Sequence, residues 1–323
     1  MKRAVRLPAV LLVAGLLVAC NSTGIAYNPP GGIGTRATLV AGFEGGAGRV
    51  VTFPGTANGN VSPSTNLNGA TTTLDNNLSG AFDSSGNLWI SDYSAVDIVE
   101  FPTSATGDVA PSRTIAGVAT TLSHPWGVVV TSNGTVYVAD AGADAIDVFA
   151  AGSSGNVAPT TRIVGVATGL DFPTGLALTK NGDIWVSNQG GNTVEEFSAS
   201  ATGDAAPIAT ISGVTTTLSN NGGLALDSHG NVWIANEGAN DIIEFAANAN
   251  GDVAPINTIS GASTNISDDF GIAIDGKGYI YEDGDGVNAI NVFAPNATGD
   301  ATPVQTISGG STDLNNLWGI AVN

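Results

Sequence analysis

The chain has 323 residues, of which 42% are hydrophobic and 11% are charged, and it contains 44 glycines. The hydrophobic fraction is ample for a substantial core, and the glycines favour an all-β protein with many tight turns over a helical one. Nine Lys and Arg residues stand against 28 Asp and Glu, for a net charge of −19. A surface this acidic repels phosphate backbones, so we expect no nucleic-acid partner.

The first segment, residues 1–19, has the composition of a secretory signal peptide. Three basic residues, Lys2, Arg3 and Arg6, are accompanied by an unbroken stretch of 13 mostly apolar residues at 7–19. A bilayer span needs about 20 apolar residues. The stretch is too short for that and is typical of the hydrophobic region of a signal peptide.

The stretch ends in Leu17-Val18-Ala19-Cys20, and Cys20 is the one cysteine of the chain. This resembles the bacterial lipoprotein signal, in which the cysteine becomes the lipidated first residue of the mature protein. The alternative is an ordinary signal peptide with a chance cysteine. A lone cysteine in an exported protein forms no internal disulfide, which favours lipidation. The resemblance implies a tether over 20–35 and an anchor in the cell envelope, in the outer membrane if the cell is diderm, because Asn21 and not Asp follows the cysteine.

Without residues 1–19 the chain keeps six basic and 28 acidic residues, a net charge of −22. Such a surface is repelled by anionic headgroups. The lipid, and not the protein surface, would therefore hold the chain at a membrane.

From residue 36 to residue 323 the sequence repeats with a period of 48 residues. Three columns carry the period, and internal repeats of this kind outrank any local pattern. The first column is Phe53, Phe101, Phe149, Phe197, Phe245 and Phe293. The second is Trp89, Tyr137, Trp185, Trp233 and Tyr281. The third is Pro63, Pro111, Pro159, Pro207, Pro255 and Pro303.

Each copy contains four short strand patterns separated by turn residues. In the third copy we expect strands at 127–131, 135–140, 145–150 and 161–165. Four antiparallel strands in 48 residues match one propeller blade. The first copy lacks its first strand and begins with 37–42, 49–53 and 65–69, whereas a first-strand pattern stands alone at 319–323. We therefore predict a six-bladed β-propeller in which the last strand completes the first blade and leaves no sheet edge open.

The repeat resembles the NHL repeat family in its sequence Gly-x-Ala-x-Asp, then Gly-Asn-x-Trp, then a strand ending in Phe. Residues 223–227, 230–236 and 241–245 are an example. The resemblance implies the propeller fold. It leaves function open, because propellers of this type include lyases, lactonase-like enzymes and binding scaffolds.

Residues present in every copy are expected to serve the fold. The aromatic columns should form the core between blades, and Val129, Ala177, Ala225, Ala273 and Ala321 should lie at the crowded axis. The Asp or Asn of Gly-(Asp/Asn)-x-x-Pro should bind the backbone of its own turn. The column Asp92, Asp140, Asn188 and Asn236 should form turns as well.

The loops that lead into the first strands should surround one mouth of the channel, where ligands of closed β-structures commonly bind. Just before these strands stand Ser79, Trp126, Thr174, Gly222, Phe270 and Trp318. Two interpretations stay open: the aromatic residues plug the mouth as packing, or a carbohydrate or peptide stacks on Trp126 or Trp318. We therefore treat Trp126, Phe270, Trp318 and the nearby His124 as candidate ligand-binding residues.

Glu282 breaks its column, whose other members are Ile90, Val138, Val186 and Ile234. Asp283 and Asp285 follow it, and Asp268 and Asp269 precede the same blade's first strand. Clustered carboxylates are the oxygen ligands that Ca²⁺ uses, so these five residues are a candidate calcium site. The alternative is a local shift at Gly284 and Gly286 that exposes Glu282, and the spacing matches no calcium loop.

Histidine occurs at two positions, His124 and His229. The resemblance to NHL-type lyases implies a zinc-binding His near position 124, but such sites use His from several blades. Here the equivalents are Phe172, Asn220, Asp268 and Asn316, which excludes a multi-histidine zinc site.

Two functions from different classes remain. The first is a monomeric binding or scaffold lipoprotein whose loop face recognises a protein, peptide or carbohydrate. The second is a divalent-metal hydrolase similar to the gluconolactonase group of six-bladed propellers. In that group, carboxylates and an Asn from different blades hold the metal on the axis. Glu282, Asp268 and either Asn220 or Asn316 would be the counterparts.

Overall fold

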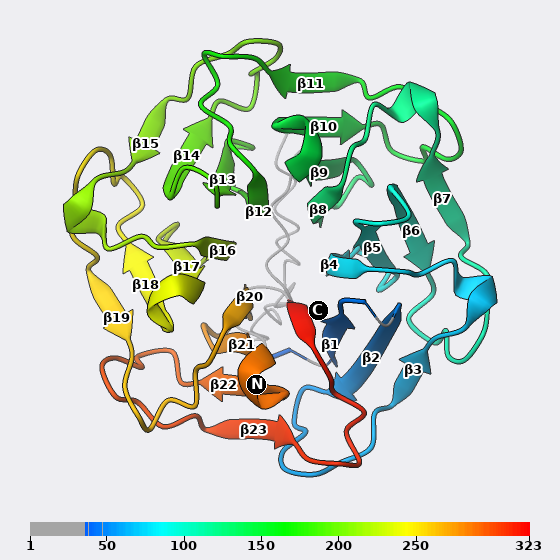
Figure 1. Cartoon of the computed structure of the whole chain (residues 1–323), viewed down its shortest axis with the longest axis vertical. Coiled ribbons are helices and arrows are strands. Elements are labelled where there is room, and N and C mark those ends of the chain that lie inside the picture. Colours follow the sequence, from blue (N-terminus) through cyan, green and yellow to red (C-terminus); the bar gives the residue numbers. More distant parts are fainter. Residues whose placement is uncertain (1–35, 38, 47) are drawn as a thin grey trace, which may run out of the picture.

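The computed structural model describes residues 36–37, 39–46 and 48–323, which form one β-propeller of six four-stranded sheets around a central axis (Figure 1). The predicted fold class is thereby confirmed. The expected signal peptide (1–19), the tether (20–35) and Cys20 lie outside the described residues. No helix in the described part of the chain is long and apolar enough to cross a membrane.

Each blade has its first strand at the axis and its fourth at the rim. Blade 1 consists of β24 (Leu317–Val322), β1 (Leu39–Glu44), β2 (Arg49–Pro54) and β3 (Thr65–Leu67). Blade 2 consists of β4 (Asn77–Phe82), β5 (Leu88–Asp92), β6 (Asp97–Phe101) and β7 (Arg113–Ala116). Blade 3 consists of β8 (Pro125–Val130), β9 (Val136–Asp140), β10 (Ala145–Phe149) and β11 (Thr161–Val164).

The remaining blades follow the same order. Blade 4 consists of β12 (Pro173–Leu178), β13 (Ile184–Asn188), β14 (Thr193–Phe197) and β15 (Ala209–Ile211). Blade 5 consists of β16 (Asn221–Leu226), β17 (Val232–Asn236), β18 (Asp241–Phe245) and β19 (Asn257–Ile259). Blade 6 consists of β20 (Asp269–Ile274), β21 (Ile280–Gly284), β22 (Ala289–Phe293) and β23 (Gln305–Ser308).

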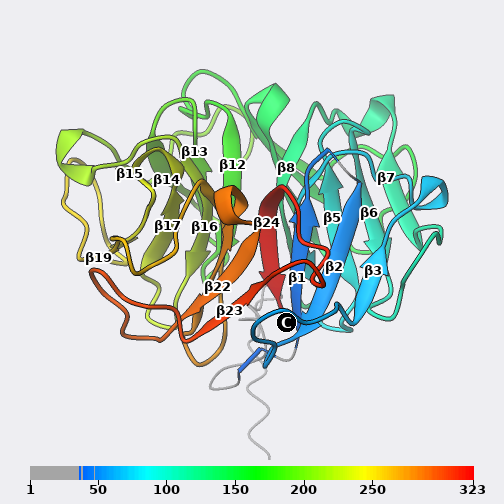
Figure 2. The ribbon, with the colours of Figure 1, turned by 60° about the horizontal axis from the view of Figure 1, so that its bottom comes forward.

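Short 3-10 helices lie in the loops at one end of the propeller. They are η1 (Ala70–Thr72), η2 (Val118–Thr120), η3 (Ala141–Ala143), η4 (Val214–Thr216), η5 (Glu237–Ala239) and η6 (Asp285–Val287). We call this end the loop end. The opposite end carries the hairpins between first and second strands, and we call it the hairpin end. Both the C-terminus and Arg36, the first described residue, lie at the hairpin end (Figure 2).

The ring closes through the C-terminal strand, as the sequence predicts. Strand β24 pairs antiparallel with β1, from Val40 opposite Val322 to Glu44 opposite Leu317. In Figure 1 the red strand β24 lies beside the blue strand β1. The closure converts what would be two free inner edges into one continuous sheet.

The predicted core columns are confirmed. The six Phe residues of the third strands are at most 1% exposed, and the Trp/Tyr column of the second strands is at most 7% exposed. Each of six apolar clusters joins two neighbouring blades; one holds Phe43 of blade 1 with Ile90 and Phe101 of blade 2. Because a flat sheet can bury its faces only against other sheets, the core lies between the blades.

Glycine lets neighbouring first strands approach closely at the loop end. A Cβ on Gly127 would lie 2.5 Å from the carbonyl oxygen of Thr174 in the next blade, and one on Gly319 would overlap the carbonyl of Leu78. This explains the first residue of the repeat Gly-x-Ala: little room is left for a side chain where the inner strands converge, and Ser79 of blade 2 is the one larger residue at this position.

A hydrogen bond repeated six times joins successive blades at the rim. Asp108 accepts from the backbone N–H of Thr71 in the preceding blade at 2.6 Å. The equivalent acceptors are Asn60, Asn156, Asp204, Asp252 and Asp300. The Asx side chain of Gly-(Asp/Asn)-x-x-Pro thus bonds across the blade interface, where the sequence predicts a bond within its own turn.

Candidate functional site

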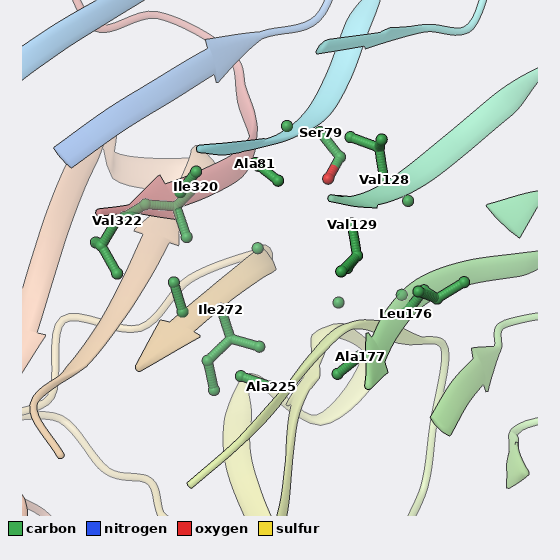
Figure 3. A pocket seen from close by; sticks show the side chains of 18 of the residues that line it. Ser79, Ala81, Val128, Val129, Leu176, Ala177, Ala225, Ile272, Ile320 and Val322 are labelled. Carbon is green, nitrogen blue, oxygen red and sulfur yellow. The ribbon is translucent and has the colours of Figure 1, made fainter. Parts of the chain in front are cut away.

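A cavity of about 470 Å³ runs along the axis between the six first strands. The small-residue column predicted at the axis lines it: Val129, Ala177, Ala225, Ala273 and Ala321, with Ala81 as the sixth member. Figure 3 shows four of them, Ala81, Val129, Ala177 and Ala225, around the open axis, and Ser79 contributes the oxygen seen among the labelled groups. Small side chains leave the axis unfilled, so the column that packs six strands together also creates the cavity.

Three aromatic rings close the loop end of this cavity. Trp126 stacks on Phe270 with ring centroids 4.8 Å apart, and Trp318 lies 6.0 Å from Trp126 and 5.5 Å from Phe270. These residues come from blades 3, 6 and 1, and blades 3 and 6 lie opposite each other. The rings therefore meet over the axis. We call these three residues the aromatic cap.

A β-bulge in each first strand places the cap. In blade 3 the pairing with β9 shifts between Pro125 and Val128, and in blade 6 the pairing with β21 shifts between Asp269 and Ile272. Trp126 and Phe270 lie inside these bulges. A bulge redirects the side chain it contains, so a single irregularity turns each ring from the blade interface towards the axis.

The cap is mostly buried. Trp126 is 6% exposed and Phe270 is 3% exposed, whereas Trp318 is half-buried. The structure thus supports the interpretation that Trp126 and Phe270 plug the mouth of the channel as packing, because their outer faces are covered. On the inner side all three residues line the cavity. Their role in ligand binding stays a prediction. Because all three line the cavity, a ligand would contact them from within the channel.

His124 lies at the surface beside the cap, where its ring is 4.5 Å from that of Tyr93. It occupies a position of positive φ that recurs in other blades, with φ 67° at His124 and φ 53° at Phe172. The equivalent residues in later blades are Asn220, Asp268 and Asn316. Asn and Asp tolerate this conformation best, so the two aromatic residues here are the strained members of the column.

The column Asp92, Asp140, Asn188 and Asn236 holds the loops that lead to the cap. Asp92 accepts from the N–H groups of Asp75 and Asn76, and also from Ser94 and Ala95 in its own turn. Asp140 accepts from Ser123 N at 2.8 Å. The predicted turn-forming role is confirmed for Asp92, and both side chains also fix the residues just before a first strand.

The hairpin end of the cavity is bounded by small and polar residues. Asp83, Ser84, Gly86, Thr131 and Asn323 lie there. No aromatic ring covers this end among the residues that line the cavity, apart from Phe82 on one side. As formed by residues 36–37, 39–46 and 48–323, the cavity is therefore a channel closed by the aromatic cap and open at the hairpins.

Glu282, Asp283 and Asp269 are each fully buried. Burial raises the pKa of Asp283 to about 8, although its carboxylate accepts hydrogen bonds from the N–H groups of Phe270 and Gly271. Burial also raises the pKa of Glu282 and of Asp269 well above the usual range, and repulsion among the three carboxyl groups adds to it. No cationic side chain forms an ion pair with any of the three in the described part of the chain.

The five candidate calcium ligands do not form one compact group. Glu282 and Asp283 are successive strand residues, so their side chains leave opposite faces of the blade. Glu282 accepts from Asn291 Nδ2 at 2.9 Å, Asp268 is exposed and Asp285 is half-buried at the loop end. Within the described residues, no three His, Cys, Asp or Glu side chains are placed to hold a metal. The calcium site stays a prediction, which a melt with Ca²⁺ or EDTA would test.

The counterparts implied by the gluconolactonase group also lie away from the axis. Asn220 donates to Glu237 at 2.6 Å and Asn316 donates to the carbonyl of Gly45 at 2.7 Å, both in the loops. Neither residue lines the cavity, and neither do Glu282 and Asp268. Sequence spacing gave the blade of each residue but not its distance from the axis.

Comparison with known proteins places this six-bladed propeller in a family. The family "Lactonase, 7-bladed beta-propeller" matches residues 38–312, and the chain therefore belongs to it. The present chain has six blades, one fewer than the family description states. Of the expected NHL resemblance, the six-bladed propeller fold is therefore shown, and the family that is shown is the lactonase propeller family. Among curated proteins, no sequence matches this chain.

Several solved structures are similar in fold. A chain of the nidogen/laminin complex aligns with a TM-score of 0.62 and 16% identity, covering 88% of this chain and 97% of that one. A protein of unknown function from Bacteroides caccae aligns with a TM-score of 0.63 and 11% identity, covering 88% and 98%. A streptogramin B lyase aligns with a TM-score of 0.51 and 16% identity, covering 73% and 70%. At these identities the similarity establishes the fold alone.

Proposed function

We propose that this protein is an exported, lipid-anchored binding protein that holds a small apolar ligand in its axial channel without altering it chemically. The observation that carries the proposal is the wall of the channel. It is built from aliphatic side chains, with the aromatic cap at one end and polar residues at the other. Ligand sites are commonly apolar hollows of about 300–1,000 Å³ with few polar groups, and this channel falls within that range.

The channel wall lacks the groups that chemistry would need. Asp83 is the one titratable residue among those that line it. Both of its carboxylate oxygens are occupied, by the N–H groups of Ser85 and Asn87 and by the side chains of Asn87 and Trp89. A nucleophile needs a base within hydrogen-bond reach, and Ser79 has none on the wall. The wall therefore supports binding over catalysis.

The binding test uses N-phenyl-1-naphthylamine, an uncharged probe that fluoresces in apolar surroundings. We expect saturable binding to the wild type and its loss in Ala225→Phe, which fills the channel. Ala262→Phe, an equal change at an exposed loop position, is the matched control and should bind normally. Equal binding by both variants, with unchanged melting curves, would place the probe outside the channel and contradict the proposal.

Anchoring is proposed through Cys20. We expect the wild type to fractionate with membranes, and mass spectrometry of the N-terminal peptide to show acyl chains on Cys20. Cys20→Ser should release the protein into the soluble fraction. An unmodified Cys20 in an exported wild-type protein would contradict this part of the proposal and leave the channel unaffected.

A second function, divalent-metal hydrolysis, is favoured by membership of the lactonase propeller family. Its weak point is geometric, because the candidate carboxylates and amides lie off the axis. A stoichiometric divalent metal in the purified protein, together with lactone hydrolysis that Glu282→Gln abolishes, would establish it over the binding proposal.

A further inference from the structure

The repeat allows blade 6 to be compared with other blades at the residue that begins each first strand. Asn77 begins β4 in blade 2, Asn221 begins β16 in blade 5, and Asp269 begins β20 in blade 6. All three side chains are fully buried. An Asn amide donates hydrogen bonds, whereas an ionised carboxylate only accepts them. The change from Asn to Asp in blade 6 therefore takes a donor out of the interior.

In blades 2 and 5 this donor binds backbone carbonyls of the preceding blade. Asn77 Nδ2 donates to Arg49 O at 2.8 Å. Asn221 Nδ2 donates to Asn188 O at 3.3 Å and to Thr193 O at 3.2 Å. These carbonyls lie where the second strand of a blade ends and its third strand begins. A side chain of one blade thus completes the backbone contacts of its neighbour.

Asp269 faces the equivalent carbonyls without a donor. At 48 residues per blade, they belong to Asn236 and Asp241 of blade 5. Burial raises the pKa of Asp269, and repulsion from Glu282, Asp283 and Asp241 adds to it, which places its carboxyl group at the interface with blade 5. Within the described residues, neither oxygen of Asp269 has a hydrogen-bond partner. In blades 2 and 5 only the amide oxygen is left without one.

Blade 5 also lacks a hydroxyl group that would donate to Asp269. Asn221 of blade 5 contacts Ser187 Oγ of blade 4 as well as the two carbonyls. The residue equivalent to Ser187 in blade 5 is Ala235. An isolated carboxylate is costly to bury unless a hydrogen bond, a proton or a cation compensates its charge, and the neighbouring blade supplies no such hydrogen bond here.

Glu282 brings one more oxygen to the same interface. Its equivalent Ile234 packs in one cluster with Trp185 and Val194 of the preceding blade, so this column faces the preceding blade. Glu282 Oε2 accepts from Asn291 Nδ2 at 2.9 Å. Glu282 Oε1 has no hydrogen-bond partner in the described part of the chain. Three buried carboxylate oxygens therefore lack a partner between blades 5 and 6.

We infer that Ca²⁺ binds between blades 5 and 6, held by both oxygens of Asp269, by Glu282 Oε1 and by the carbonyl oxygens of Asn236 and Asp241. Five oxygens and two carboxylates suit this ion, which takes six to eight oxygen ligands in flexible geometry. Water beside the partly exposed Asp241 would complete the set. Zn²⁺ prefers nitrogen and sulfur ligands, and Mg²⁺ keeps several waters, which a buried interface does not hold.

The site would join two blades beside the aromatic cap. Asp269 is the first residue of the bulge that carries Phe270, so the ion would fix this bulge to blade 5. Neither Asp269 nor Glu282 lines the channel. The inference therefore goes beyond the proposed binding function and does not depend on it. It also needs only two of the five carboxylates that the sequence suggested as calcium ligands.

The test uses the purified full chain and Ca²⁺ itself. We expect equilibrium dialysis with radioactive calcium to show one ion per chain, which an equal concentration of Mg²⁺ does not displace. Melting curves in CaCl₂ and in EDTA supply the second readout. At a Ca²⁺ concentration about 100 times the Kd, the melting temperature should be about 5 °C higher than in EDTA.

Residues from other blades supply variants that should fold. Asp269→Asn restores the amide of blades 2 and 5, and Glu282→Ile restores the isoleucine of the same two blades. We expect each variant to lose Ca²⁺ binding and the calcium-dependent melting shift while it keeps a cooperative melt. Asp268→Asn is the matched control, because it removes the same charge at the adjacent exposed residue, where Asn220 and Asn316 stand in other blades. It should bind Ca²⁺ as the wild type does.

The contrary outcomes are distinct. A wild type that binds no Ca²⁺, or melts equally in EDTA, overturns the inference and assigns a proton to Asp269 as the donor to the carbonyls. Unchanged binding by Asp269→Asn, or its loss in Asp268→Asn, places the ion elsewhere and overturns it as well. Binding of N-phenyl-1-naphthylamine reports on the channel separately, so either proposal can fail alone.

Discussion

At the residue scale, blade 6 is distinguished by three carboxyl groups with no exposed surface, those of Asp269, Glu282 and Asp283. Asp283 stands where Ser91 and Ser187 stand in blades 2 and 4, and each of these serines donates to a backbone carbonyl. Asp283 instead accepts from the N–H groups of Phe270 and Gly271. It thereby holds the bulge that directs Phe270 into the aromatic cap.

This arrangement predicts a dependence of stability on pH. The pKa of Asp283 is about 8 in the fold and about 4 in the unfolded chain. Between these values the folded state binds more protons, so the free energy of unfolding falls as pH rises. Buried Asp97, Asp140 and Glu195, whose pKa values burial raises to about 7, act in the same direction.

We expect the melting temperature to be about 5 °C or more higher at pH 5 than at pH 8. Asp283→Ser should reduce this difference, because serine, which blades 2 and 4 have at this position, does not titrate between pH 5 and pH 8. Calorimetric melts at matched ionic strength measure both effects. A melting temperature that rises from pH 5 to pH 8 would refute the account.

At the element scale, the blades are joined by their faces and by their rims. The faces supply the apolar core, and the rims add backbone bridges such as Leu67 with Gly107 and Ile115 with Gly155. These bridges cover the outer strand of each blade, which would otherwise present an unpaired edge. The side-chain bond of Asp108 to Thr71 N lies beside the first bridge.

Asp108→Ala should lower the free energy of unfolding by about 1 kcal/mol, the usual contribution of one hydrogen bond. Asp108→Asn should have little effect, because Asn60 and Asn156 make the same bond in other blades. Urea denaturation compares the two variants with the wild type. Equal destabilisation by both would show that charge, and not the hydrogen bond, is what matters.

At the scale of the whole molecule, β24 decides whether the ring is closed. It pairs with β1 in blade 1 and packs against β4 and β20 on either side. Deleting residues 319–323 removes four of the five paired positions and leaves β1 as a free inner edge. It also removes part of the channel wall.

This deletion should therefore give an insoluble protein or a broad, non-cooperative melt. Removal of Asn323 alone keeps all five pairs and serves as the control. Circular dichroism melts distinguish the two. A sharp transition at the wild-type temperature after deletion of 319–323 would mean that the ring does not depend on β24.

The repeat made most of the fold predictable. Equivalent positions in the six blades have the same environment. A residue type that recurs at all six, such as Phe53 to Phe293, therefore indicates a buried position more reliably than any single residue does. Strand bounds were less accurate: the strand expected at 37–42 is β1, Leu39–Glu44, and the one expected at 127–131 is β8, Pro125–Val130. For β8 the reason is the bulge at the loop end, which extends the first strand beyond the alternating pattern.

The candidate site was predictable only in part. The small-residue column and the aromatic residues of the cap were both identified, because each stands out against the repeat. Together these residues form a channel that is closed at one end. The sequence did not predict this channel, because it depends on rings from opposite blades meeting over the axis. Glu282 was recognised as a break in its column, but its distance from Asp268 and from the axis could not be inferred from spacing.

By itself, the sequence determined the number of blades, the closure by the last strand and the surplus of acidic residues, because these follow from periodicity and composition. The tertiary structure alone decided which end of the channel the aromatic cap closes and that rings from blades 1, 3 and 6 meet there. Both properties arise from residues that are far apart in the chain and adjacent only once the six blades close around the axis.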